Sequence, residues 1–158
     1  MKSHYRVAVI GGGVVGTSVL YHLAKLGWTD VCLIERSVLT AGSSWHAAGG
    51  IHALNADPNI AQLQAYTIDL LTEIEKESGQ DIGLHMTGGL TMAGTPERWE
   101  WLQSAYRTFQ SIGIDDCRLV TVEEAVALNP IMSGEGLLGG MWADREGYVD
   151  TTGTVHAY

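Results

Sequence analysis

The chain is short, moderately apolar and acidic. It has 158 residues, of which 46% are hydrophobic and 17% are charged, and its formal net charge at pH 7 is -9. This length and composition are typical of one soluble globular domain with a modest core. Because the net negative charge repels phosphate backbones and anionic lipids, we expect no nucleic-acid partner.

Cysteine and histidine usage argues against a disulfide framework or a metal centre. Cys32 and Cys117 are far apart in the sequence and each has apolar neighbours, which favours reduced core thiols. The histidines outside the small-residue loop are not spaced as metal ligands are: His4, His22, His52, His85 and His156. We therefore expect no metal ion.

No targeting or membrane-spanning segment is visible. The apolar stretch after Arg6 is interrupted at once by three glycines, and no signal-peptide cleavage site follows. No apolar run approaches the roughly 18 residues that a membrane-spanning helix needs. We therefore expect a cytoplasmic protein, or a mitochondrial matrix protein in a eukaryote, although no transit peptide is seen.

The first 35 residues predict a strand, a helix and a second strand. Residues 6–10 form a short β-branched run that ends at three glycines, which is typical of a strand buried in a parallel sheet. Residues 14–26 carry apolar side chains at helical spacing, and Gly27 ends that pattern. Residues 30–35 predict the second buried strand. Together they have about the ~30 residues of a βαβ unit.

A loop of small residues at 40–50 follows, and then helical periodicity over residues 60–77 ends at Gly79. Short apolar pieces at 84–93 are broken by two glycines, and residues 96–112 predict a helix with a proline near its start.

Further along the chain, Thr121 and Glu124 have the spacing of a capping box, which opens a helix that Asn129 and Pro130 end. Residues 136–149 predict a pair of strands, and residues 151–158 begin a helix. Because that helix stops without a cap, we expect the chain to be a fragment.

The predicted fold class is α/β, a Rossmann-type domain followed by the start of a mixed α+β substrate domain. We assign residues 1–80 to the cofactor-binding region and residues 81–146 to the beginning of the substrate domain. Residues 147–158 return toward the first region.

The glycines between the first strand and helix satisfy G-x-G-x-x-G in the context that makes this pattern specific for a dinucleotide. Gly11 permits the tight turn, Gly13 lets the backbone approach a pyrophosphate, and Gly16 lets the helix pack closely. We expect free N–H groups, including those of Val14 and Val15, to face the pyrophosphate.

An acidic residue completes the dinucleotide pattern. Glu35 lies 19 positions after Gly16, where an acidic residue binds a ribose hydroxyl and disfavours a 2′-phosphate. The fingerprint alone leaves FAD and NAD open. The small-residue loop that follows favours FAD, because its glycines and serines suit an extended ligand beyond the adenosine half.

Several motifs give the chain a resemblance to a known family. Tyr21-His-Leu-Ala24, Leu33-Ile-Glu-Arg36 and above all Thr40-Ala-Gly-Ser-Ser-Trp-His-Ala-Ala-Gly49 resemble the dimethylglycine dehydrogenase and sarcosine dehydrogenase group of glycine oxidase-like (D-amino-acid oxidase) flavoproteins. Weaker similarity continues through Thr87-Gly-Gly-Leu90 and Asp144-Arg-Glu-Gly-Tyr-Val-Asp150. In that group the motif histidine is joined covalently to the 8α carbon of the flavin, and the resemblance assigns this role to His46.

The predicted cofactor-binding residues combine the fingerprint, the strand end and the loop. They are Gly11, Gly13, Val14, Val15, Gly16, Glu35, Arg36, Gly42, Ser43, Ser44, Trp45, His46, Ala47, Ala48, Gly49 and Gly50.

The resemblance implies oxidation of the CH–NH group of an N-methylated amino acid such as dimethylglycine or sarcosine. The electron acceptor would be an electron-transfer flavoprotein or oxygen, and tetrahydrofolate is expected only in a longer form. We expect the catalytic residues beyond the end of this chain, which would then be inactive alone. Two alternatives stay open: an amino-acid oxidase or deaminase of the same fold, and a non-catalytic flavin-binding regulatory protein.

Overall fold

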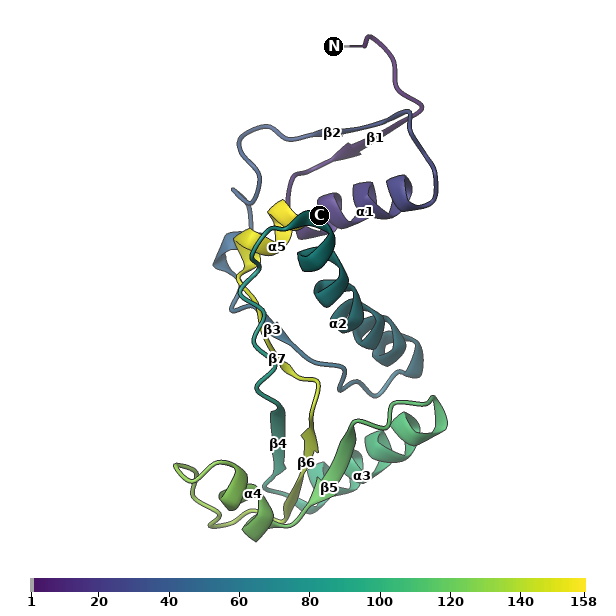
Figure 1. Cartoon of the computed structure of the whole chain (residues 1–158). Coiled ribbons are helices and arrows are strands. Elements are labelled where there is room, and N and C mark those ends of the chain that lie inside the picture. Colours follow the sequence, from purple (N-terminus) through teal and green to yellow (C-terminus); the bar gives the residue numbers. More distant parts are fainter. Residues whose placement is uncertain (1) are drawn as a thin grey trace. The chain divides into compact units, whose positions relative to one another are not determined.

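The structure is a computed structural model that describes residues 2–158 (Figure 1). It divides into two compact units. The first contains the chain up to Gly49 together with Leu70–Leu84 and Tyr148–Tyr158, and the second contains Gly50–Asp69 and His85–Gly147. The assignment of residues 1–80 to a cofactor region and 81–146 to a substrate region stays a prediction.

The predicted strand–helix–strand unit is present in the first compact unit. Strands β1 (Val7–Ile10) and β2 (Val31–Ile34) pair in parallel, and α1 (Val14–Lys25) connects them and contacts both. Gly27 has a φ of 85°, in the left-handed region that glycine adopts readily, and turns the chain after the helix.

The prediction that both strands are fully buried was wrong. Ile10 is 84% exposed and Ile34 is 52% exposed. Successive side chains of a strand point to opposite faces of the sheet, and α1 packs against this two-stranded sheet. Within the described residues, side chains on a face of the sheet that nothing covers, such as Ile10 and Ile34, therefore stay in solvent.

Two further helices contribute to the first unit. Helix α2 (Pro58–Ser78) ends at Gly79, whose φ is 68°, and the border between the units falls within this helix, after Asp69. Helix α5 (Thr151–Ala157) begins at Asp150, whose carboxylate accepts the N–H of Thr152 at 3.2 Å and of Gly153 at 2.8 Å. Helix α5 contacts α1, so the last residues pack onto the first unit.

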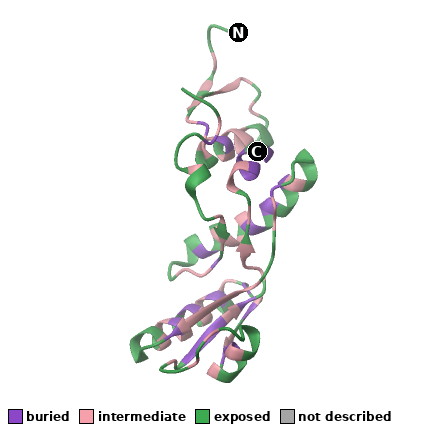
Figure 2. Ribbon diagram, turned by 90° about the vertical axis from the view of Figure 1, so that its left-hand side faces the viewer, coloured by how far each residue is buried: buried purple, intermediate pink, exposed green. Residues whose placement is uncertain are grey.

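The second unit is built on a three-stranded antiparallel sheet. Strands β4 (Gly89–Ala93), β6 (Gly139–Ala143) and β5 (Cys117–Val120) lie in the order β4-β6-β5. Helix α3 (Pro96–Ser111) contacts all three strands, and the purple segments of Figure 2 show the buried residues between helix and sheet. Leu102 and Phe109 of the helix meet Met141 of the central strand in this core.

The capping box opens a helix as predicted. In α4 (Val122–Leu128), Thr121 Oγ1 accepts the N–H of Glu124 at 3.2 Å, and the Glu124 carboxylate accepts the N–H of Thr121 at 2.8 Å. Such a pair satisfies two amides that would lack a partner at the helix start.

The predicted strand pair across residues 136–149 was wrong in its pairing. That range does hold β6 and the short strand β7 (Gly147–Tyr148), but β6 pairs with β4 and β5. Strand β5 was not predicted from the sequence. The remaining short elements are a 3-10 turn, η1 (Ser44–His46), and strand β3 (Gly50–Ile51).

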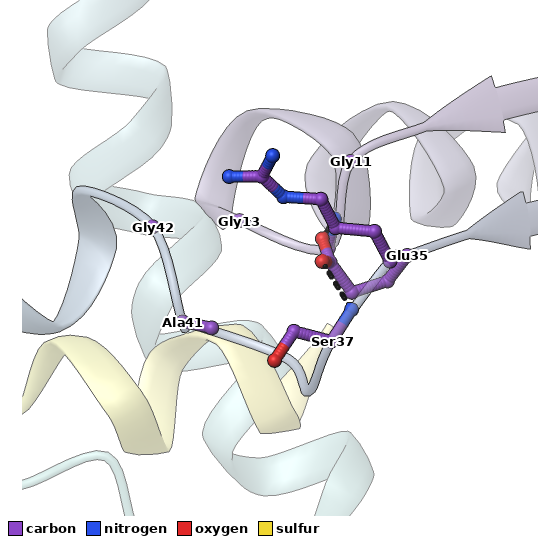
Figure 3. A pocket seen from close by; sticks show the side chains of 8 residues that line it. Gly11, Gly13, Glu35, Ser37, Ala41 and Gly42 are labelled. Atoms are coloured by element: carbon purple, nitrogen blue, oxygen red, sulfur yellow. Dashed lines mark hydrogen bonds between the residues drawn. The ribbon is translucent and has the colours of Figure 1, made fainter.

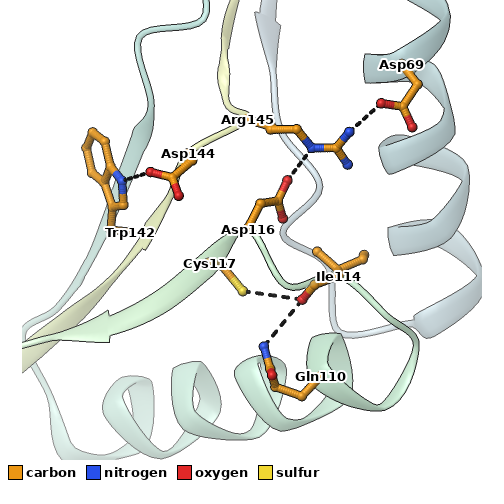
Figure 4. A network of polar contacts seen from close by, with 8 residues as sticks. All are labelled: Asp69, Gln110, Ile114, Asp116, Cys117, Trp142, Asp144 and Arg145. Atoms are coloured by element: carbon orange, nitrogen blue, oxygen red, sulfur yellow. Dashed lines mark hydrogen bonds and ion pairs between the residues drawn. The ribbon is translucent and has the colours of Figure 1, made fainter.

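An arginine holds the connection after β6. The Arg145 guanidinium pairs with Asp69 of α2 and with Asp116, which precedes β5 (Figure 4). Beside it, Cys117 is buried and its Sγ lies 3.9 Å from the Ile114 carbonyl oxygen. Cys117 is thus a buried free thiol, as predicted, and burial raises the pKa of this thiol to about 11. Cys32 is also a free thiol but is only partly buried.

Candidate cofactor site

A pocket of about 450 Å³ lies where the chain leaves β1 and β2 (Figure 3). In open parallel sheets, ligands bind outside the carboxyl ends of the strands, which is the position of this pocket. Its lining comes from the glycine turn after β1, from the end of β2 and from the start of the small-residue loop: Gly11, Gly12, Gly13, Glu35, Arg36, Ser37, Ala41 and Gly42.

The Glu35 carboxylate is fixed by two backbone donors. Its Oε2 accepts the N–H of Gly12 at 2.7 Å, and its Oε1 accepts the N–H of Ser37 at 2.9 Å. The N–H of Gly12, followed by that of Ser37, holds the pKa of Glu35 below its ordinary value. A carboxylate has about four acceptor positions, so both oxygens keep lone pairs for the two hydroxyls of a ribose.

The glycine turn is shaped by close approaches of the backbone. Gly11 has a φ of 112°, and a Cβ on Gly16 would overlap the carbonyl oxygen of Gly11. The first glycine therefore makes the turn and the last lets α1 approach it, as the fingerprint predicts.

The N-terminus of α1 corrects one prediction. The N–H of Val14 donates to Ser44 Oγ at 2.9 Å and so is not free. Gly13, the N-cap residue, has no side chain to accept this N–H, and the hydroxyl oxygen of Ser44 in the loop accepts it instead. The Ser44 hydroxyl hydrogen makes no bond within residues 2–158, so it can donate to an anion at the helix end. The N–H of Val15 is one of the amides that a helix start leaves without an intrahelical partner.

The loop begins at a strained residue. Thr40 is 8% exposed and has a φ of 71°, the sole non-glycine residue with positive φ among residues 2–158. Its N–H donates to the carbonyl oxygen of Gly12 at 2.9 Å. This bond fixes the start of the loop against the glycine turn, which explains how a left-handed threonine is held.

His46 is oriented by its own loop. Its Nδ1 lies 3.1 Å from the carbonyl oxygen of Gly42. A carbonyl can only accept, so Nδ1 carries the hydrogen and Nε2 keeps the lone pair of a neutral ring. The Trp45 and His46 ring centroids are 3.8 Å apart, and both side chains are exposed.

The remaining predicted residues divide into two groups. Gly13 and Arg36 lie with Glu35 around the pocket, whereas Ser43, Ala47 and Ala48 are exposed loop residues outside its lining. The end of the loop, Gly49, has a structural reason to be glycine, because a Cβ there would overlap the Val149 carbonyl oxygen.

Gly50 belongs to the second compact unit. The sequence-based prediction missed three lining residues: Gly12, Ser37 and Ala41. The run of three glycines was the signal that could have found Gly12.

The residues fit a dinucleotide. The helix start and the Ser44 hydroxyl offer donors for a pyrophosphate, and Glu35 offers acceptors for a ribose diol. A Cβ added to Gly11 or Gly42 would meet no atom within 4 Å, so open space lies beside the backbone at these two lining glycines. Fold and site together define a Rossmann-type dinucleotide-binding protein.

The family follows from comparison with known proteins. The model of the FAD dependent oxidoreductase family matches residues 6–158, and the chain belongs to this family. The predicted α/β fold with a Rossmann-type FAD-binding region is thereby confirmed. Of the solved structures, L-proline dehydrogenase from P. horikoshii superposes with a TM-score of 0.89 over 99% of this chain and 41% of that one, at 24% identity, which supports the fold alone.

Sequence relatives are consistent with the predicted resemblance. The chain is 36% identical over 150 residues to mitochondrial dimethylglycine dehydrogenase of Rattus norvegicus, covering 94% of this chain. It is 33% identical over 155 residues to human mitochondrial sarcosine dehydrogenase, covering 98% of this chain. The chain spans 17% of the length of each relative.

Residues 2–158 lack both a membrane-spanning helix and a cluster of metal-binding side chains. No helix in that range is long and apolar enough to cross a membrane. The same range holds no group of three or more His, Cys, Asp or Glu side chains placed to bind a metal ion.

Proposed function

We propose that the chain is the cofactor-binding part of an oxidoreductase that oxidises the CH–NH group of N-methylated amino acids. The observation that carries the cofactor assignment is the Glu35 carboxylate, held by Gly12 and Ser37 at the edge of the glycine pocket. The substrate class rests on the two relatives, whose names are dimethylglycine dehydrogenase and sarcosine dehydrogenase.

In this proposal, the chain's own residues bind the cofactor and orient it. Glu35 accepts the ribose hydroxyls, and the α1 start with Ser44 donates to the pyrophosphate. The loop around Trp45 and His46 contacts the flavin half. FAD, when bound, supplies the two-electron acceptor for the amine, and the protein contributes binding and orientation.

We further propose that His46 is the covalent attachment residue. Because Nδ1 is held by the Gly42 carbonyl oxygen, Nε2 is the nitrogen with an available lone pair. If FAD is bound there, attachment of Nε2 to the 8α carbon would exchange a C–H bond for a C–N bond, with one proton released to solvent and two electrons passed to an acceptor such as oxygen.

Turnover separates this function from its alternatives. The full-length, FAD-loaded protein that contains this chain is mixed with dimethylglycine or sarcosine and an artificial electron acceptor, and formaldehyde and reduced acceptor are measured. Formaldehyde in proportion to reduced acceptor supports N-demethylation. Retention of FAD without turnover of either amine would contradict the substrate assignment, and peroxide formed without the artificial acceptor would identify an oxidase.

A further inference from the structure

A second pocket, of about 340 Å³, lies within the second compact unit and shares no residue with the proposed cofactor site. It combines an acid, a guanidinium, an imidazole and a hydroxyl with an indole and an aliphatic side chain. The lining residues are His52, Leu54, Thr91, Arg98, Trp101 and Glu146.

Glu146 is the acidic end of this pocket. Its carboxylate lies over the backbone of Gly89 in β4, where an added Cβ would overlap Oε2 and stand 2.8 Å from the Glu146 Cβ. Partial burial raises the pKa of Glu146, while His52 and the backbone N–H of Ala53 act in the opposite direction. The protein thus keeps a partly desolvated acid where a glycine leaves room for it, and an approaching cation would stabilise its charged form.

Arg98 is the basic end. It lies in the first turn of α3, and its guanidinium carbon is 4.0 Å from the centroid of the Trp101 ring. Within residues 2–158, the ion pairs involve other basic side chains and leave Arg98 without a carboxylate partner. Stacking fixes one face of the guanidinium and leaves its N–H edge able to bind a carboxylate with two parallel bonds.

Thr91 adds a hydroxyl to the pocket. It stands two residues after Gly89 on β4, so both residues face the same side of the sheet, with Met141 opposite Thr91. The Thr91 hydroxyl makes no hydrogen bond within the described part of the chain, residues 2–158. It can therefore donate to a ligand carboxylate or accept from a ligand ammonium.

We propose that this pocket binds an amino acid as its zwitterion, with the carboxylate on Arg98 and Thr91 and the ammonium on Glu146. A ligand with a single charge would pair with only one of the two groups, the Glu146 carboxylate or the Arg98 guanidinium. A zwitterion pairs with both. Trp101 and Leu54 give apolar surface for a side chain or N-methyl groups. The choice of an N-methylated ligand rests on the proposed function, whereas the pocket lies wholly within the second unit and its binding does not require the cofactor.

Three probes of equal shape test the charge requirement on the full chain. They are dimethylglycine, 3-methylbutanoate, which replaces the ammonium by CH, and dimethylglycinamide, which replaces the carboxylate by an amide. Saturation-transfer NMR on the methyl signals gives the affinity of each. We expect dimethylglycine to bind at least about tenfold more tightly than either analogue, and equal binding of 3-methylbutanoate would overturn the zwitterion site.

Matched variants assign the binding to this pocket. Arg98→Gln and Glu146→Gln should each weaken dimethylglycine binding at least about tenfold. The control variants Arg107→Gln and Glu100→Gln, at exposed positions of α3, should not. Circular dichroism checks that each variant is folded. The two substituted pocket residues lie in different parts of the fold, Arg98 in α3 and Glu146 after β6. Unchanged affinity in both would overturn the inference. Loss of FAD binding with intact dimethylglycine binding would count against the proposed function alone.

Discussion

The backbone N–H of Gly12 donates to Glu35 Oε2 at 2.7 Å, so the turn after β1 directly sets the position of the acid at the end of β2. On its other side, the Gly12 carbonyl oxygen accepts the N–H of Thr40 at 2.9 Å. One residue thereby joins the fingerprint, the acidic residue and the loop. Gly12 occupies a position that the G-x-G-x-x-G pattern leaves unspecified, yet it is a positioning residue for the site.

Replacing Gly12 by alanine should weaken FAD binding. The new Cβ would stand 2.7 Å from Leu39 Cδ2 and 3.1 Å from the Glu35 Cβ, which forces the acid away from the pocket. We expect a loss of about tenfold in affinity, or about 1.4 kcal/mol, measured by flavin fluorescence titration. Gly94→Ala is the control, since its Cβ would meet an atom only at 4.0 Å. Equal affinities in the two variants would show that Gly12 does not position Glu35.

Ser44 should contribute to both stability and binding. Ser44→Ala removes the acceptor of the Val14 N–H, and losing an N-terminal hydroxyl of this kind costs about 1 kcal/mol. The thermal midpoint should fall and FAD should dissociate faster. Ser44→Thr keeps the hydroxyl and should restore both properties, because the bond needs only an oxygen at that place. A Ser44→Ala protein with the parent's midpoint and dissociation rate would contradict the role.

The strand–helix–strand unit was predictable because its signals are local. A β-branched run, three glycines and helical spacing over residues 14–26 determine each element within a few neighbours. The capping box of Thr121 and Glu124 is local in the same sense. Burial was not predictable, because the exposure of Ile10 depends on which elements pack against the sheet.

Strand pairing and the second pocket depend on contacts between distant residues. Strand β5 has four residues and is stabilised by β6, which begins 19 positions after it ends, and helix α4 lies between them in place of a short hairpin turn. The link between Val14 and Ser44 joins residues 30 apart. Thr91, Arg98 and Glu146 likewise have no spacing that predicts a shared pocket.

The stability of the protein should depend on pH through Glu146. Burial raises its pKa in the folded state above that in the unfolded chain. Its contribution to stability is therefore fully present below the unfolded value, near 4.5, and is lost as pH rises through the folded value. Glu146→Gln should match the parent's thermal midpoint at low pH and exceed it at neutral pH. Glu100→Gln is the exposed control, and a constant difference across pH would refute this dependence.

His46 should hold flavin covalently in the full-length, FAD-loaded protein that contains this chain. After acid precipitation, the yellow colour should stay with the parent and be released from His46→Ala, whereas His4→Ala, at an exposed position, should behave as the parent. Peptide mass analysis and NMR of the flavinylated peptide should place the bond on Nε2, because Nδ1 is held by Gly42. Flavin released in full from the parent, or a bond at Nδ1, would contradict this assignment.

The central claim is that the glycine pocket with Glu35 binds FAD, and equilibrium dialysis tests it most directly. The purified chain is dialysed in parallel against FAD, NAD and NADP at equal concentrations, and the bound fraction of each is measured. Glu35 disfavours the 2′-phosphate of NADP, and we expect the Gly42–Gly50 loop to extend the site beyond what NAD would occupy. We expect retention of FAD alone. Preferential retention of NAD or NADP would contradict the account.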